Sequence, residues 1–432
     1  MRSLVIALVV CALITVAACV RAPHAGQSLP DAVSEGLPAA LAPTPARRWP
    51  ALDREPELAI RLLRGSEVSC RLLLPCRLSD ASELPAGPLS VRAAGEGFLI
   101  GTRRLAGPSL TLTPHGDGPA IALGSGRNAD RFAGSLVLVR NHGEVELIEH
   151  VGLETWLAGV LPAEMNPAWP VEALVAQAIA ARSYAAARWQ ARQGEAWHLV
   201  RGTADVAYDG VVPLSANVTA ALARSRGLLL VEDGQAILAR FHAASGGRTE
   251  DSEAQWPGAT LLDGSTPLSR FMPPVDDPAS AAGARGLGWT ATHQDWRAAI
   301  PLAEITRALR IWSEAVPTRP RLGQVRSVRI GSLRQPSGRV ASVVVVHGSA
   351  NSEAVLDAAG FRLAVGAGRL RSLWWERCTV TSADQLVVTG HGFGHGVGLP
   401  QVSAWALARD GQRGEDIISR YYPRATLSRA WR

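Results

Sequence analysis

One acidic side chain, Glu164, stands in the stretch of this chain best suited to proton-transfer chemistry. It lies in the segment Leu-Pro-Ala-Glu-Met, which is followed by Asn-Pro-Ala-Trp-Pro and then by an alanine-rich run. Proline fixes φ and lacks an amide donor, so the prolines on both sides of the acid predict a stiff turn. The sequence therefore predicts a single carboxyl presented on a rigid loop just before a helix.

The run from Val171 to Ala191 predicts that helix. Apolar residues recur along it at spacings of three and four, and Arg182 lies on the same face. An arginine in such a place either extends its head to water or pairs with an anion in a cleft. The nearest candidate anions are Glu164 and a bound substrate.

The composition is that of a globular protein with a basic balance. The 432 residues suffice for two domains or one large one. The net charge of +6 and the isoelectric point near 9.5 suit an anionic partner, such as wall polymer or lipid headgroups, and by composition also nucleic acid. The chain has no lysine, which excludes Schiff-base chemistry through a lysine.

The N-terminus predicts export. Residues 1–19 have a basic start, an apolar centre and small residues before Cys19, as in a secretory signal peptide. The ending Val-Ala-Ala-Cys resembles a bacterial lipobox, which would make Cys19 a lipidated anchor in a bacterial membrane. The alternative is an ordinary signal with an incidental cysteine. Residues 20–50 are rich in alanine and proline and predict a disordered tether.

Folded sequence begins near residue 57. Short alternating apolar runs separated by Gly, Pro, Asn and Asp predict a β-rich, antiparallel region over residues 57–150. Residues 151–427 are predicted to form a helix-containing core, with further helices at 302–312, 352–363 and 402–409. The expected fold class is therefore α+β.

Two cysteines of the β-rich region are candidates for a disulfide. Cys70 and Cys76 are close in sequence, and a disulfide is permitted outside the cytoplasm. The alternative is that these two and Cys378 are unpaired thiols, because the sequence does not give the Cα separation.

Two glycine-containing segments carry histidines. Residues 241–250 read FHAASGGRTE, and residues 390–401 read GHGFGHGVGLPQ. Glycine permits positive φ and close approach of the backbone to a ligand. The second segment lacks the lysine and hydroxyl residue of a phosphate-binding P-loop. Ser245 with His242 lacks the nucleophile elbow and an identifiable orienting acid of a serine hydrolase.

Together these segments resemble the SpoIID/LytB (stage II sporulation protein D) family of peptidoglycan-acting proteins. Residues 159–185 are similar to the family's Pro-Ser/Ala-Glu-Met loop and the helix after it. Residues 241–249 are similar to its FHSSSGGRT segment, and residues 390–401 to its GxGxGHGVGMSQ signature, with Leu399 and Pro400 in place of Met and Ser. The resemblance covers roughly residues 57–427, and it implies that the core of residues 151–427 surrounds a glycan cleft.

The resemblance implies a lytic transglycosylase that cleaves the MurNAc–GlcNAc linkage and leaves 1,6-anhydro-MurNAc ends, with Glu164 as general acid and base. The sugar's own C6 hydroxyl is then the nucleophile, so one carboxyl suffices where a hydrolase generally needs two. Burial against Met165 and Trp169 would favour the protonated acid. The residues expected to bind or orient the glycan are Arg182, Tyr184, His242, Ser245, His395 and Gln401.

Some relatives carry a zinc site in the region of residues 195–210, built from a His and two Cys. Here that region has His198 and Asp205 but no cysteine, which is a poor zinc set, so no metal and no cofactor are expected. The expected partners are peptidoglycan glycan strands, with a cell-wall amidase as a further candidate, and not nucleic acid. Two alternatives stay open: a non-catalytic amidase enhancer that binds wall glycan, and a structural lipoprotein that tethers the envelope to the wall.

Overall fold

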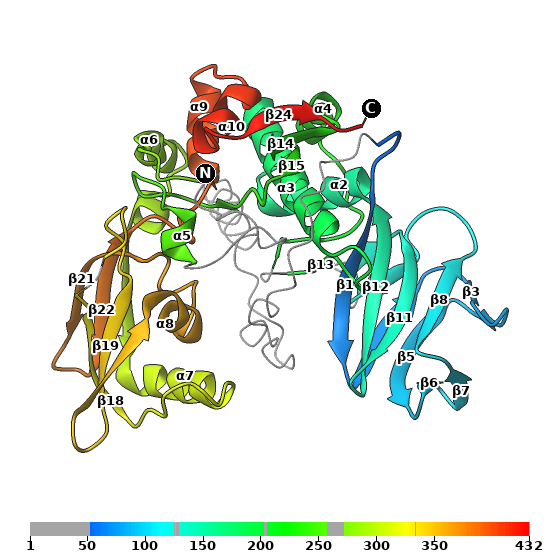
Figure 1. Ribbon diagram of the computed structural model, residues 1–432, viewed down its shortest axis with the longest axis horizontal. Coiled ribbons are helices and arrows are strands. Elements are labelled where there is room, and N and C mark those ends of the chain that lie inside the picture. The colour runs from blue at the N-terminus through cyan, green and yellow to red at the C-terminus, as the bar shows by residue number, and fades with distance from the viewer. Residues whose placement is uncertain are drawn as a thin grey trace, which may run out of the picture. The chain divides into compact units, whose positions relative to one another are not determined.

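The computed structural model describes residues 52–124, 126, 129–202, 205–256, 272–332 and 334–431. The predicted signal peptide, the tether and Cys19 lie outside the described residues. The described chain forms two compact units. The N-terminal unit comprises residues up to 169, 181–229 and 428–431, and the C-terminal unit comprises residues 170–180 and 230–427. Both helices and strands are abundant and the N-terminal part is β-rich, which confirms the α+β prediction (Figure 1).

The N-terminal unit is built on two sheets, which are antiparallel except for the short strand β13. Its strands are β1 Glu57–Gly65, β2 Glu67–Leu72, β3 Cys76–Leu78, β4 Glu83–Leu84, β5 Gly87–Ala94, β6 Gly97–Ile100, β7 Arg103–Ala106, β8 Ser109–Pro114, β9 Ile121–Leu123, β10 Asp130–Phe132, β11 Ser135–Asn141, β12 Glu144–Gly152 and β13 Leu199–Val200. One sheet has the order β13-β1-β12-β11-β8-β3-β4, with β13 parallel to β1, and the other the order β10-β9-β2-β5-β6-β7. Strand β12 packs against β2 and β5 of the other sheet, so the two sheets form a sandwich.

The alternating sequence pattern explains why these strands form. In β8, Leu110 and Leu112 are buried while the residues between and around them are more exposed. Such alternation is typical of a sheet with one face on a core. Strand β12 departs from it, because it lies between β1 and β11 and also faces the second sheet. The buried residues of β12 include two acids, Glu146 and Glu149.

Three helices follow the sandwich: α2 Leu153–Glu164, α3 Val171–Ala191 and α4 Ala216–Ser225. Helix α3 has the predicted bounds, and the division between the two units falls within it. The prediction that Glu164 lies on a turn is wrong, because the residue ends helix α2 and Pro162 lies inside that helix. The buried apolar stripe of α2 keeps the chain helical through Pro162. Among the helices of the described chain, none is both long and apolar enough to cross a membrane.

The C-terminal unit contains several small sheets and short helices. Its strands include β16 Phe241–His242, β17 Asp295–Pro301, β18 Val325–Ile330, β19 Ser342–His347, β20 Ser352–Asp357, β21 Trp374–Val380, β22 Gln385–His391 and β23 Leu399–Pro400. Its helices include α5 Ser252–Gln255, α6 Ala279–Gly286, α7 Leu302–Glu314, α8 Ala358–Val365, α9 Gln401–Arg409 and α10 Gly414–Tyr421. A further three-stranded sheet joins β14 Leu228–Glu232, β15 Gln235–Ala236 and β24 Thr426–Arg429.

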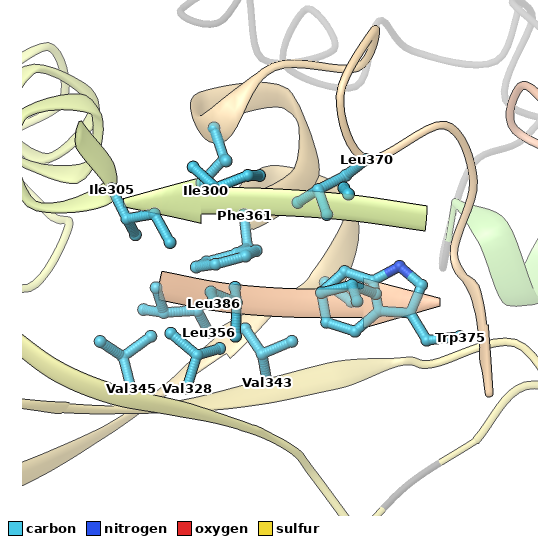
Figure 2. Close-up of a cluster of buried hydrophobic side chains, with 14 of the residues drawn as sticks. Ile300, Ile305, Val328, Val343, Val345, Leu356, Phe361, Leu370, Trp375 and Leu386 are labelled. Carbon is cyan, nitrogen blue, oxygen red and sulfur yellow. The ribbon is translucent and has the colours of Figure 1, made fainter. Parts of the chain in front are cut away.

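Two of these sheets, β17-β22-β21 and β18-β19-β20, share one hydrophobic core with α7 and α8. Figure 2 shows Phe361 of α8 among side chains of β17, β22 and β19, with Trp375 at one end of the cluster. Deep burial of such aromatic and branched side chains is the main source of stability for this region.

One predicted helix is partly a strand. Residues 352–363 were expected to be helical, but β20 occupies Ser352–Asp357 and α8 begins only at Ala358. Strand β20 pairs with β19 along its whole length, and this pairing overrides local preference. Asp357 then caps α8 by accepting the Gly360 amide at 2.6 Å.

Candidate functional site

Glu164 is held by a backbone amide. It ends helix α2, and the chain leaves the helix at Met165 with extended backbone, φ −131° and ψ 149°. The Glu164 side chain is partly exposed, and its Oε1 accepts the Ala207 N–H at 2.8 Å. A donor on one carboxyl oxygen fixes the orientation of the whole group. The acid is therefore oriented while it keeps exposed surface.

The segment after Glu164 is rigid, as the prolines predict. Asn166 makes the turn, since its Oδ1 accepts the Ala168 amide at 2.9 Å and its carbonyl oxygen accepts the Trp169 amide at 3.0 Å. Met165 and Trp169, the two side chains expected to lie against the acid, are both buried. Glu164 is thus flanked by a helix on one side and a fixed turn on the other.

The amide that holds Glu164 belongs to residues 205–210, named here the 205–210 loop. Asp205 ties the start of this loop to the body of the unit. Its Oδ1 accepts the Tyr184 hydroxyl at 2.6 Å, and its Oδ2 accepts the Val200 amide at 2.8 Å. The Arg188 guanidinium lies 3.3 Å from Oδ1. Tyr184, predicted to bind glycan, is buried at this contact.

Tyr208 ties down the second half of the loop. Its carbonyl oxygen accepts the Arg201 Nε–H at 2.9 Å. Its ring meets Phe132 edge-on with centroids 5.5 Å apart and lies 6.2 Å from the ring of Trp156 on α2. The loop is therefore fixed on both sides of Ala207, and the partner of Glu164 is a stationary donor.

Gly159 sets the distance between α2 and this loop. A Cβ at Gly159 would lie 2.2 Å from the Gly210 carbonyl oxygen and 2.7 Å from the Tyr208 ring. Alanine normally stabilises a helix relative to glycine, by about 1 kcal/mol. Here we expect the opposite sign: Gly159→Ala should lower the free energy of unfolding by about 1–3 kcal/mol, because the backbone must move to relieve the overlap.

Urea unfolding measures that change. Gly360→Ala is the matched control, because a Cβ at Gly360 in α8 would come no closer than 3.3 Å, to the end of the Asp357 side chain. A Gly159→Ala variant as stable as the control would contradict the close approach.

Arg182 is not placed to contact a glycan. The structure instead buries it completely, with 0% of its surface exposed. Its Nε and Nη2 donate to the two carboxyl oxygens of Glu154 at 3.0 and 2.9 Å, and it also donates to the Ser225 hydroxyl and the Leu228 carbonyl oxygen. Of the two expectations for this arginine, water or an anion, the structure shows an anion, but it is Glu154 rather than Glu164 or a substrate.

Glu154 collects further donors around this pair. Its Oε1 also accepts the Gly227 amide at 3.0 Å and the Trp431 indole N–H at 2.9 Å. Burial opposes ionisation of Glu154, but the Arg182 charge and these hydrogen bonds outweigh it and hold the pKa of Glu154 below its ordinary value. The pair is therefore ionised and joins the start of α2 to α3 and to the end of the chain.

The two glycine-containing segments lie side by side in the C-terminal unit. Strand β16 pairs in parallel with β23, so His242 lies opposite Pro400. Ala244 and Phe393 exchange backbone hydrogen bonds of 2.9 and 2.8 Å. The structure thus brings together two motifs that are far apart in the sequence, as their shared role in one site would require.

The glycines of the second segment serve this close pairing. Gly394 has a φ of +114°, and a Cβ there would lie 2.6 Å from the Cβ of His242. Gly398 has a φ of +71°, and a Cβ there would lie 2.0 Å from the Arg240 carbonyl oxygen. The expected positive φ is present, but these glycines make room for Arg240 and His242 of this chain, and the expected approach to a ligand stays a prediction.

His242 and His395 form a cluster of rings. Their centroids lie 5.4 Å apart, and the ring of Trp256 lies 5.2 Å from His395. The Arg240 guanidinium lies over the ring of Trp256, 4.1 Å from its centroid. His395 and Trp256 are partly exposed, whereas His242 is buried. Trp256 was not singled out from the sequence, because its spacing does not distinguish it from the other tryptophans.

Both histidines are neutral near pH 7. Burial, with the nearby charge of Arg339, lowers the pKa of His242 to about 3. Burial, with His242 and Arg240 nearby, holds the pKa of His395 well below its ordinary value. His395 accepts the Val397 amide at Nδ1, 3.0 Å away. A neutral imidazole can form hydrogen bonds with a sugar, but it carries no charge that could attract an anion.

Ser245 and Gln401 are buried. The Ser245 hydroxyl donates to Asp277 Oδ2 at 2.6 Å, so Asp277 binds the serine directly rather than through a histidine. This is not the geometry of a serine-hydrolase triad. Asp277 also accepts the hydroxyls of Ser403 and Tyr421, at 2.7 and 2.8 Å. Sequence reasoning missed this buried acid, because nothing local marks it. Gln401 is the first residue of α9.

The remaining candidates are the two cysteines of the β-rich region and His198. Cys70 and Cys76 are free thiols, and burial raises the pKa of Cys70 to about 12 and that of Cys76 above its ordinary value, so both are protonated. Their disulfide stays a prediction. His198 accepts the Ala59 amide at Nδ1, 2.9 Å away. Within the described ranges, the structure contains no group of three or more His, Cys, Asp or Glu residues arranged to hold a metal.

Comparison with known proteins adds two matched regions. Residues 141–231 match the family model described as SpoIID, stage II sporulation protein, and residues 288–398 match a domain of unknown function, DUF8618. The first region contains Glu164, its helix and the 205–210 loop. The second contains the whole hydrophobic core of Figure 2.

Curated proteins that are similar to this chain at low identity include the following three. An uncharacterised protein of Brachyspira hyodysenteriae is 26% identical over 297 residues, which are 68% of this chain and 72% of that protein. Stage II sporulation protein D of Bacillus subtilis is 24% identical over 302 residues, 66% of this chain and 76% of that protein. The amidase enhancer of Bacillus subtilis is 27% identical over 304 residues, 63% of this chain but 40% of that protein.

Proposed function

This chain belongs to the SpoIID family and has a cell-wall-related role, and from that premise we propose that it is a lytic transglycosylase acting on peptidoglycan glycan strands. The observation that carries the proposal is the placement of Glu164. The acid lies in the region matched to the family, keeps exposed surface at the end of α2 and is oriented by the Ala207 amide. A single acid fixed in this way is what the reaction needs.

In the proposed reaction Glu164 acts first as acid and then as base. It donates its proton to the oxygen that links MurNAc to GlcNAc while the bond from that oxygen to MurNAc C1 breaks. The C6 hydroxyl of the same MurNAc attacks C1 and closes the 1,6-anhydro ring. The proton of that hydroxyl passes to the Glu164 carboxylate, which restores the acid. No water is consumed, so no second carboxylate is required to activate one.

A second surface is proposed to bind the strand. The partly exposed His395 and Trp256 offer a neutral hydrogen-bonding ring and an aromatic face, and aromatic faces suit the apolar face of a sugar ring. His242, Ser245 and Gln401 belong to the same two motifs, but their side chains are buried and support the backbone there. Their predicted role in glycan binding is therefore proposed as indirect.

Product analysis tests the proposed reaction. The purified protein is incubated with intact peptidoglycan and with peptide-stripped glycan strands, and the products are identified by mass spectrometry. We expect 1,6-anhydro-MurNAc ends. New reducing ends would instead mean a hydrolase with a second carboxylate, and intact strands that stay bound to the protein would mean a binding protein.

The alternative function is that of a non-catalytic amidase enhancer, and the similarity to the Bacillus subtilis protein of that name favours it. In that case the protein would bind wall glycan and stimulate a separate amidase. The rate of stem-peptide release by a cell-wall amidase, with and without the protein, tests this directly. Stimulation that persists in Glu164→Gln, with no anhydro ends from either protein, would establish the enhancer function.

We propose that the protein works outside the cytoplasm, anchored by a lipid on Cys19. The basis is the lipobox-like ending of the predicted signal peptide. Metabolic labelling with a fatty acid should mark the wild type and leave Cys19→Ser unlabelled and unanchored. A labelled Cys19→Ser variant would show that the anchor is elsewhere.

A further inference from the structure

Asp205 is a buried carboxylate with three anchors and 6% of its side chain exposed. Two anchors are side chains of helix α3: the Tyr184 hydroxyl, 2.6 Å from Oδ1, and the Arg188 guanidinium, 3.3 Å from the same oxygen. The third is the Val200 amide of strand β13, 2.8 Å from Oδ2. A carboxylate with charged and neutral donors on both oxygens is firmly fixed.

This fixed point lies two residues before the donor to Glu164. The chain runs from Asp205 to Ala207, whose amide reaches Glu164 Oε1 at 2.8 Å, and the buried Tyr208 holds it immediately afterwards. Thus the position of the Ala207 N–H depends on Asp205 on one side and on Tyr208 on the other. Neither Tyr184 nor Asp205 has enough exposed surface to be a glycan contact.

We propose that Tyr184 and Asp205 are positioning residues, which hold the 205–210 loop so that the Ala207 amide fixes the Glu164 carboxyl in its reactive orientation. This inference rests on the proposed transglycosylase function and reassigns Tyr184 from glycan binding. With Oε1 accepting the amide, the proton to be transferred resides on Oε2. Loss of the loop anchor lets the carboxyl rotate, and a displacement of about 1 Å can lower a rate by about 100-fold.

Two conservative variants test the proposal through kinetics. Tyr184→Phe removes one hydroxyl, and Asp205→Asn keeps the shape of the side chain while it removes the charge. We expect turnover on peptide-stripped strands to fall by about 10-fold in Tyr184→Phe and by about 10- to 100-fold in Asp205→Asn, with KM within about twofold of the wild type. Ser313→Ala removes a buried hydroxyl from α7 and is the control, with expected wild-type turnover.

Hydrogen exchange at the Ala207 amide tests the same coupling without catalysis. We expect this amide to be protected in the wild type and in Ser313→Ala, and to exchange at least about tenfold faster in Tyr184→Phe and Asp205→Asn. Circular dichroism and thermal unfolding confirm that each variant is folded. Hydrogen exchange at the Ala207 amide therefore tests the positioning role even if the protein cleaves no glycan.

The outcomes separate the two proposals. Lower turnover with faster Ala207 exchange supports the positioning role. A rise in KM alone would make Tyr184 a glycan contact and overturn the inference, while the transglycosylase function would stand. Unchanged turnover and exchange would overturn it as well. A wild type without anhydro products would refute the proposed function, and Ala207 exchange would still decide whether the loop depends on Tyr184 and Asp205.

Discussion

Glu164→Gln should lower the rate at which anhydro-MurNAc ends form by about 10²- to 10⁴-fold. Glutamine keeps the shape of the side chain, and its carbonyl oxygen can still accept the Ala207 amide. The loop and the fold should therefore be unchanged. What is lost is the acidic proton, because an amide neither protonates the leaving oxygen nor takes up the proton of the C6 hydroxyl.

The measurement is the initial rate of anhydro-end release from peptide-stripped strands, with binding to the strands measured in parallel. Binding should stay within about threefold of the wild type, since the substitution is nearly isosteric. Glu376→Gln, an exposed acid on β21, is the control for loss of a carboxylate. Full cleavage by Glu164→Gln would place the general acid elsewhere in the chain.

Arg182→Met should lower the free energy of unfolding of the N-terminal unit by about 3–5 kcal/mol, because it leaves Glu154 buried without its counter-charge. Methionine fills much of the same volume, so the effect reports the lost pair more than a cavity. Urea unfolding measures the change. Arg329→Met is the matched control: Arg329 pairs with Glu353 at 2.9 Å, but its side chain is 55% exposed. A surface pair of this kind contributes about 1 kcal/mol or less.

The pH dependence of that difference has a definite sign. The pKa of Glu154 is lowered in the folded protein by Arg182 and by its hydrogen bonds, against the effect of burial. Its contribution to stability is therefore present above the ordinary glutamate pKa, about 4.3, and is lost as the pH falls through the lower folded value. In Arg182→Met the Arg182 charge no longer opposes the effect of burial, which raises the pKa of Glu154, so the gap between wild type and variant should narrow as the pH falls from 7. A gap that is constant between pH 7 and pH 3 would show that the charge pair is not its cause.

Much of the local structure could be predicted from the sequence. The bounds of α3 follow from its apolar spacing, and the eight alternating runs predicted between residues 57 and 150 correspond to β1, β2, β5, β6, β8, β9, β11 and β12. The sequence patterns of α3 and of these strands were clear, because hydrophobic periodicity reflects burial of one face. The signal was weak for residues 352–357, where pairing with β19 decided the structure.

Some residues of the candidate site could be identified from the sequence and others could not. Glu164 and the two glycine-containing segments were identified from residue type and local pattern. Asp277 was missed and Arg182 was given the wrong partner, because each makes its contacts with residues distant in sequence. Asp205 was considered only as a metal ligand, although the structure shows it bound by Tyr184, Arg188 and Val200.

By itself the sequence determined the α+β class, the helix from Val171 to Ala191, the rigid turn after Glu164 and the glycine positions that permit positive φ, because these depend on intrinsic backbone geometry and on periodic burial. The tertiary structure alone decided that Arg182 pairs with Glu154, that Ala207 holds Glu164 and that β16 lies beside β23. These contacts join residues far apart in the chain. A buried polar group needs a hydrogen-bond partner, and only the fold determines which distant group comes close enough to be that partner.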